Sequence, residues 1–160
     1  MMLLWSGLAL AAAPAGPEQW TVTVDPLTVA LGFVHVQVEH TLGERASIYV
    51  GPSLRLYDGL LGPSAHPYVG FGGEVGVRGF VWGKAPRGAW VMARGVLADV
   101  VAEGKGELGG YTSALVGFTG ILGPGLVLSG GAGVSYFDYG PAYGIHGVLP
   151  ALHTNIGWAF

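Results

Sequence analysis

The sequence predicts an all-β fold, namely an eight-stranded antiparallel up-and-down transmembrane β-barrel. Only 11% of its residues are charged, against roughly 25% in a typical soluble domain, and its mean hydropathy is +0.51. Thirty glycines and ten prolines oppose long helices, and beyond the N-terminal segment no run approaches the ~18 consecutive apolar residues of a spanning helix. Apolar residues instead alternate with small or polar ones, as strands with two different faces require. A closed barrel satisfies the backbone polar groups of such strands inside a membrane.

The N-terminal segment is predicted to be a signal peptide over residues 1–15, followed by the barrel over residues 18–160. Residues 2–13 are mostly apolar or small, and cleavage is possible after Ala13 or Ala15. No Lys or Arg precedes this run, which departs from the usual pattern of such segments. A short buried helix is the alternative interpretation of the same residues.

The remaining composition narrows the classes of function. A chain of 160 residues forms one domain at most. The absence of cysteine excludes a disulfide scaffold and thiol chemistry. A net charge of -3 gives no sign of a nucleic-acid partner. We therefore expect a monomer that binds no nucleic acid and needs no cofactor.

The first strand is expected at residues 20–30. Val22 and Val24 share one face there. Leu27 and Val29 fall on the other face, so a bulge or bend at Asp25-Pro26 is required. The sequence signal is weaker here than in any other predicted strand.

Seven further strands are expected, each an alternating segment bounded by turn residues, at 33–39, 47–56, 68–82, 89–101, 111–121, 126–138 and 148–160. The connections are expected near 31–32, 42–45, 58–67, 83–88, 102–110, 122–125 and 139–147. From the second connection onward, short and long connections alternate. Barrels in outer membranes have short periplasmic turns and longer outer loops, so this pattern places both termini in the periplasm.

The two faces of the predicted strands differ in chemistry. One face collects aliphatic side chains, which we expect to face lipid: Val34, Val36, Val38, Ile48, Val50, Leu54, Val75 and Val77. The other face collects charges, which we expect in the lumen: Glu39, Arg55, Glu74, Arg78 and Arg94. Eight strands leave an interior just wide enough for side chains, so these charges must pair or meet water. Glu74 is expected to pair with Arg94, Arg78 or both.

Aromatic residues gather near the predicted strand ends. Four tryptophans fall at the periplasmic ends and four tyrosines at the outer ends, namely Trp20, Trp82, Trp90 and Trp158, and Tyr57, Tyr68, Tyr111 and Tyr136. Amphipathic rings favour lipid–water interfaces. The alternation turns Trp82 and Trp90 inward. This weakens the indication, given by the other aromatic residues, of a ring of side chains at the lipid–water interface.

The last strand alternates an apolar face with a polar one and ends in Ile156-Gly157-Trp158-Ala159-Phe160. This ending resembles the C-terminal signal of bacterial outer-membrane barrels, and the mature chain resembles small eight-stranded barrels of the OmpA and OmpX kind. The resemblance implies a place in the outer membrane of a Gram-negative cell envelope. It also implies that Ile156, Trp158 and Phe160 act as an assembly signal for the barrel-assembly machinery. Neither this ending nor the alternation of strands and turns identifies a subfamily, and many such porin-like barrels have no assigned activity.

Three functional interpretations remain open from these residues. Two carboxylates facing three guanidiniums favour a structural plug in the lumen, with a narrow ion channel as the alternative.

The five histidines lack metal-ligand spacing, so no metal site is expected. For a lipid-A-modifying enzyme, the best combination of rim residues is Ser64, His66 and His146. We expect no catalytic residue, hence a structural or surface-interaction role. A soluble lipocalin-like barrel would need the valines inside and the charges outside.

Overall fold

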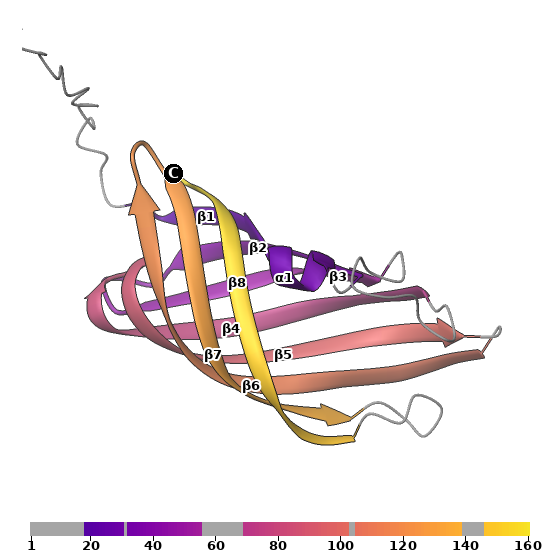
Figure 1. Ribbon diagram of the computed structural model, residues 1–160. Helices are drawn as coiled ribbons and strands as arrows, with labels where there is room; N and C mark the ends of the chain where they lie inside the picture. The colour runs from indigo at the N-terminus through magenta and orange to yellow at the C-terminus, as the bar shows by residue number, and fades with distance from the viewer. Residues whose placement is uncertain (1–17, 31, 56–68, 103–104, 139–145) are drawn as a thin grey trace, which may run out of the picture.

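The computed structural model describes residues 18–30, 32–55, 69–102, 105–138 and 146–160. They form a closed antiparallel barrel in which each strand pairs with its sequence neighbours and β1 pairs with β8 (Figure 1). The strands are β1 (Trp20–Val24), β2 (Phe33–Thr41), β3 (Ala46–Arg55), β4 (Val69–Lys84), β5 (Arg87–Ala102), β6 (Lys105–Leu122), β7 (Leu126–Asp138) and β8 (His146–Ala159), and the short helix α1 spans Pro26–Ala30. The prediction of an all-β, eight-stranded antiparallel barrel is confirmed. The predicted signal peptide lies outside the described residues.

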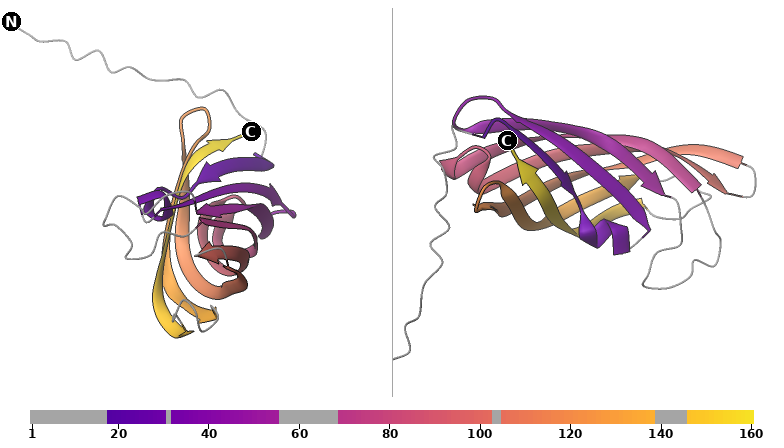
Figure 2. Two further views of the ribbon diagram at one scale, coloured as in Figure 1. Left: turned by 90° about the vertical axis from the view of Figure 1, so that its right-hand side faces the viewer. Right: turned by 90° about the horizontal axis from the view of Figure 1, so that it is seen from above.

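Both ends of the described chain lie at one end of the barrel, together with the connections at 42–45, 85–86 and 123–125 (Figures 1 and 2). We call this the turn end. The amides of Gln19 and Trp20 donate to the Phe160 carbonyl at 3.1 and 3.0 Å, which ties the start of β1 to the end of β8. The helix α1 and the C-terminal ends of β3, β5 and β7 lie toward the opposite end, which we call the far end.

The first predicted strand is wrong beyond Val24. The structure has no bulge there; β1 stops and α1 begins at Pro26. The Asp25 carboxylate accepts hydrogen bonds from the amides of Leu27 and Thr28, at 3.0 and 3.3 Å, and so caps the helix. Proline suits the first position of a helix because its missing N–H has no partner there anyway. Asp25-Pro26 is therefore a helix start, which prevents this segment from continuing as strand.

The predicted connection at 102–110 is also wrong, because β5 and β6 continue through it. Their register extends from Gly88 opposite Thr119 to Ala102 opposite Lys105. Leu108 still points outward, 72% exposed, while Val100 points inward and is buried. The glycines of this segment suggested a loop, but the alternation of faces persists across them. In Figure 1 this hairpin projects beyond the other strands at the far end.

One tryptophan faces the opposite way from its predicted direction. The β4–β5 register shifts between Phe80 and Trp82, so the two residues no longer follow simple alternation. Trp82 is consequently 66% exposed, whereas Trp90 points into the barrel and is 1% exposed. A bulge adds one residue to a strand and reverses the face of everything beyond it. Period-two counting could not detect this shift.

Candidate functional site

The lumen is the candidate site, because it holds all five charged residues that the sequence placed there. Glu39 lies on β2, Arg55 on β3, Glu74 and Arg78 on β4, and Arg94 on β5, and each is no more than 7% exposed. The structure brings four of them together as two ion pairs, between Arg78 and Glu39 at 2.6 Å and between Arg94 and Glu74 at 3.9 Å. Arg55 lies beside Phe33, with its guanidinium 4.8 Å from the centre of that ring.

Arg78 is the centre of this lumen network. Its Nη1 donates to Glu39 Oε2 at 2.6 Å, and its Nη2 lies 3.1 Å from Nε2 of His153 on β8. The guanidinium also lies 5.3 and 5.1 Å from the ring centres of Tyr49 and Trp90. Charge-assisted hydrogen bonds and aromatic faces together hold a planar guanidinium in one orientation. Arg78 therefore joins side chains from opposite parts of the wall.

Glycines opposite the two lumen aromatics make this packing possible. Tyr49 pairs across strands with Gly76, where an added Cβ would lie 2.3 Å from Tyr49 Cε1. Trp90 pairs with Gly117, where a Cβ would lie 2.3 Å from Trp90 Cζ2. The Trp90 Nε1 donates to Thr119 Oγ1 at 2.9 Å, so its polar atom is satisfied. The glycines opposite Tyr49 and Trp90 therefore provide the space that the two rings occupy.

Glu39 is fully engaged by neighbours on both sides of β2. Its Oε2 accepts from Thr21 Oγ1 at 3.2 Å in addition to Arg78, and its Oε1 accepts a short hydrogen bond from Ser47. A buried carboxylate is tolerated when its oxygens accept several hydrogen bonds and a cation lies beside it. Glu39 meets both conditions.

Glu74 has a different environment. Its Oε2 lies 3.4 Å from His35 Nδ1 and 3.9 Å from Arg94 Nη1. Within the described residues, neither oxygen of Glu74 accepts a hydrogen bond of good geometry. Its stabilisation therefore comes mainly from the charge of Arg94 rather than from directed hydrogen bonds. Of the two partners that the sequence predicted for Glu74, the structure pairs it with Arg94, whereas Arg78 binds Glu39.

Asp25 is a third lumen carboxylate, which the alternation of the sequence did not reveal. This residue is fully buried, its Oδ2 lies 3.3 Å from His153 Nδ1, and its Oδ1 accepts from Thr154 Oγ1 at 2.6 Å. Burial raises the pKa of Asp25, but hydrogen bonds from His153, Thr154 and Thr28 outweigh it and hold that pKa below its usual value. Asp-Pro before an apolar turn is a helix-start signal, which could have located it.

His153 connects Asp25 to the guanidiniums. Its ring is fully buried, with Nδ1 3.3 Å from both Asp25 Oδ2 and Arg94 Nη1 and Nε2 3.1 Å from Arg78 Nη2. Because a guanidinium only donates, Nε2 accepts from Arg78, and the proton belongs on Nδ1 facing Asp25. Among the described residues that are buried in the lumen, three carboxylates, Asp25, Glu39 and Glu74, then lie against three guanidiniums, Arg55, Arg78 and Arg94. This set of side chains is balanced in charge.

The outward face of the wall is apolar. All eight residues predicted to face lipid point away from the lumen: Val34, Val36, Val38, Ile48, Val50, Leu54, Val75 and Val77. Of these, Val50, Val75 and Val77 are about half exposed, at 54%, 49% and 51%. The other strands add exposed side chains of the same kind, including Val91, Leu97, Val116, Phe118, Leu128, Val134, Leu152 and Ile156. Together they form an apolar belt around the barrel.

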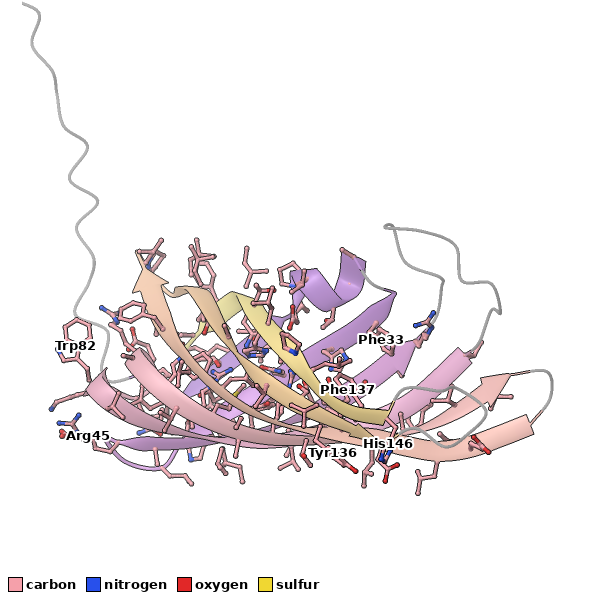
Figure 3. All side chains as sticks on the ribbon, turned by 60° about the horizontal axis from the view of Figure 1, so that its bottom comes forward. Phe33, Arg45, Trp82, Tyr136, Phe137 and His146 are labelled. Carbon is pink, nitrogen blue, oxygen red and sulfur yellow. The ribbon has the colours of Figure 1, made fainter. Side chains whose placement is uncertain are left out.

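The two ends of the belt carry polar and aromatic groups. At the turn end lie the exposed rings of Trp20, Trp82 and Trp158, and beside Trp82 the Arg45 side chain reaches the Gly83 carbonyl at 3.3 Å (Figure 3). At the far end Asp138 and His146 face each other across β7 and β8, 3.3 Å apart. The C-terminal Ile156, Trp158 and Phe160 all point outward and are exposed.

The remaining sequence hypotheses concern metals and rim catalysis. No group of three or more metal-ligating His, Cys, Asp or Glu side chains occurs within the described residues. Ser64 and His66, which the sequence grouped with His146, lie outside those residues. In the part of the chain that the structure covers, no helix has the length and apolar character needed to cross a membrane.

Comparison with known proteins gives no relative. No protein-family model matches the chain, and neither a curated protein nor a solved structure matches it. The fold defines the chain as a small closed antiparallel β-barrel with a polar interior. Any function must be inferred from the distribution of its own side chains.

Proposed function

We propose that this protein is an integral outer-membrane β-barrel whose lumen is closed by a polar side-chain plug, and whose role is structural or one of surface interaction. The observation that carries the proposal is the distribution of the side chains across the barrel wall, which is the inverse of that in a soluble protein. The apolar belt points outward while three carboxylates and three guanidiniums are buried inside. Soluble monomers rarely expose apolar patches beyond a few hundred Å², and this belt surrounds the molecule.

The dimensions of the belt support a bilayer environment. On β7 it runs over residues 126–136, bounded by the turn at 123–125 and by Asp138. A transmembrane strand needs about 9–11 residues when tilted by about 45°. The exposed tryptophan rings at the turn end match the interfacial aromatics of such barrels. The lipocalin-like alternative needs its aliphatic stripes inside, and here the eight aliphatic residues of β2, β3 and β4 named above point outward.

The plug supports a closed lumen rather than a channel. Arg78 is fixed by Glu39, His153 and two aromatic rings, so a permeating ion would have to displace a charge-balanced set of contacts. Purified protein in planar bilayers should therefore show no steady single-channel conductance. A stable current that changes in Arg94→Ala would favour the channel instead.

The membrane proposal is tested with Val77→Arg and the matched control Val77→Leu. Val77 is exposed in the belt, and Arg on a lipid face costs roughly 2 to 4 kcal/mol near the bilayer midplane. Folding into lipid vesicles, followed by heat-dependent gel mobility, should be impaired by Val77→Arg and unchanged by Val77→Leu. Wild-type protein that remains monomeric in water without detergent would contradict the proposal.

The proposed partners are the outer-membrane lipids and, during biogenesis, the barrel-assembly machinery. Phe160 supports this because its side chain is exposed on the outer face while its backbone already pairs with Trp20. Deleting Phe160 should lower the yield of folded protein in cells more than it lowers the stability of the refolded barrel. An equal yield in cells would remove the targeting role.

A further inference from the structure

A chain of three side chains at the far end is not used by the lumen plug. Tyr136 and Asp138 lie on β7, and His146 lies opposite Asp138 on β8. The Tyr136 hydroxyl lies 3.3 Å from His146 Nε2, and His146 Nδ1 lies 3.3 Å from Asp138 Oδ1. Figure 3 shows Tyr136 and His146 side by side at the end of the barrel away from Trp82.

The chemistry of the groups fixes their roles. An ionised carboxylate only accepts, so His146 Nδ1 carries a proton toward Asp138. In the neutral imidazole Nε2 is then the acceptor, and the Tyr136 hydroxyl must be the donor. A hydroxyl, a base and a group that orients the base thus stand in the order that nucleophilic catalysis uses. Both His146 and Asp138 are open to approach, with side chains 64% and 73% exposed.

We propose that Tyr136, His146 and Asp138 form a reactive site that takes acyl groups from ester-linked lipids at the boundary of the apolar belt. The choice of a lipid ester rests on the proposed membrane function. Tyr136 ends the belt on β7, and Asp138 is the first charge beyond it, so an ester group at the lipid–water interface would lie at this height.

The reaction is an acyl transfer. The Tyr136 oxygen attacks the ester carbonyl carbon as its proton moves to His146 Nε2, and a new aryl ester bond forms. The bond from the carbonyl carbon to the alkoxide breaks, and the imidazolium returns the proton to the leaving alcohol. Water then attacks the carbonyl carbon of the aryl ester and gives a proton to His146. The bond from that carbon to the Tyr136 oxygen breaks, the imidazolium returns the proton to the phenolate, and the carboxylic acid is released.

The first test uses a water-soluble aryl sulfonyl fluoride as the electrophile, on protein folded in detergent micelles, with peptide mass spectrometry to locate the label. Tyr136 should be labelled, and His146→Gln should slow this labelling roughly tenfold or more, because a positioned general base contributes at least that much. Asp138→Asn should slow it less. The matched control His40→Gln alters an outward histidine at the turn end, stacked on Trp20, and should have no effect.

The pH dependence separates a catalytic base from a merely structural neighbour. The pH profile of labelling should change shape in His146→Gln, because the reaction then loses the side chain that accepts the phenol proton. Equal rates and equal profiles in the two proteins would overturn the proposed site. Because all three side chains lie on the surface, their variants should fold as the wild type does.

A second test addresses the lipid substrate. Vesicles that contain a phospholipid with a fluorogenic acyl ester should be hydrolysed by wild-type protein and at least about tenfold more slowly by Tyr136→Phe. Sulfonyl fluoride labelling that depends on His146, without any lipid hydrolysis by protein shown to be inserted, would overturn the assignment to lipid esters. If the protein fails to insert but labelling in micelles still depends on His146, the membrane proposal fails separately from the reactive site.

Discussion

The two sides of the barrel wall are closed in different ways. On one side β4, β5 and β6 pair along nearly their whole length, and β5 and β6 stay in register from Gly88 to Ala102. On the other side β1 pairs with β8 only over residues 21–24, although β8 continues to His146. We call the region between β8 and β2 beyond Val24 the seam. Continuous backbone ladders hold the first side, and mainly side chains hold the seam.

The seam is filled by α1 and joined by one carboxylate. The Asp25 amide donates to the His35 carbonyl of β2 at 3.3 Å, while Asp25 Oδ2 accepts from the Thr154 amide of β8 at 3.4 Å. A side-chain oxygen thus takes the place that a strand carbonyl would hold. Asp25 also caps α1 and faces His153, so helix, wall and lumen meet at this residue.

Pro150 protects the edge that the seam leaves unpaired. The amides of Thr154 and Phe160 point toward β1, and backbone directions alternate along a strand, so Pro150 also faces the seam. A proline there offers no N–H to an approaching strand. A barrel can therefore interrupt its backbone ladder if a carboxylate, a helix and a proline replace the missing strand.

The largest expected effect comes from removing the carboxylate of the seam. Asp25→Asn leaves three guanidiniums against two carboxylates and weakens the bonds to Thr154, Leu27 and Thr28. Breaking a buried charge pair costs about 3–5 kcal/mol, and we expect about 5 kcal/mol here because one residue serves three partners. Urea unfolding in detergent micelles measures the loss. The control Glu44→Gln breaks an exposed pair with Lys84 and should leave the unfolding midpoint essentially unchanged.

A lumen carboxylate on the continuous side should matter less. Glu74→Gln removes the charge that faces Arg94 at 3.9 Å but no hydrogen bond of good geometry. We expect a loss of about 3 kcal/mol, at the lower end for a broken buried pair. A loss larger than that of Asp25→Asn, in the same unfolding experiment, would show that the seam is not the weaker closure.

Local opening should distinguish the two sides without any mutation. Amides in the middle of β5 are paired on both sides by long strands, whereas those of Val22 and Val24 lie beside the seam. We expect hydrogen exchange roughly tenfold or more faster at Val22 and Val24 than at Val91 and Ala93. Equal protection would mean that the barrel opens only as a whole.

The smallest expected effect is the acid response of the seam. The pKa of Asp25 is depressed in the folded protein, so its contribution is complete above the usual value of ~3.9 and is lost as pH falls through the lower folded pKa. The stability difference between wild type and Asp25→Asn should therefore shrink below pH ~4. Unfolding midpoints of both proteins across this range give the difference, and a gap that stays constant would exclude this assignment.

The sequence predicted the closed barrel and the direction of most side chains, because both follow from period-two alternation. Glu39 and His153 show this, since each lies on the buried face that its strand pattern indicated. The choice of partner for Arg78 could not be predicted, because it depends on how strands distant in the sequence meet across the lumen. The sequence misplaced Asp25 because its role depends on capping a helix. It misplaced Trp82 because a bulge interrupts the period-two alternation of faces.

The placement of the tryptophans gives the molecule a built-in optical contrast. Among the described residues, Trp90 is the one indole sealed in the lumen, against glycines and the Arg78 guanidinium, while Trp20, Trp82 and Trp158 are exposed. A quencher dissolved in lipid or water would reach the exposed rings and quench their fluorescence. The emission of Trp90 would remain unquenched. Replacing those three and Trp5, which lies outside the described residues, with phenylalanine would therefore make tryptophan emission a direct report on the plug.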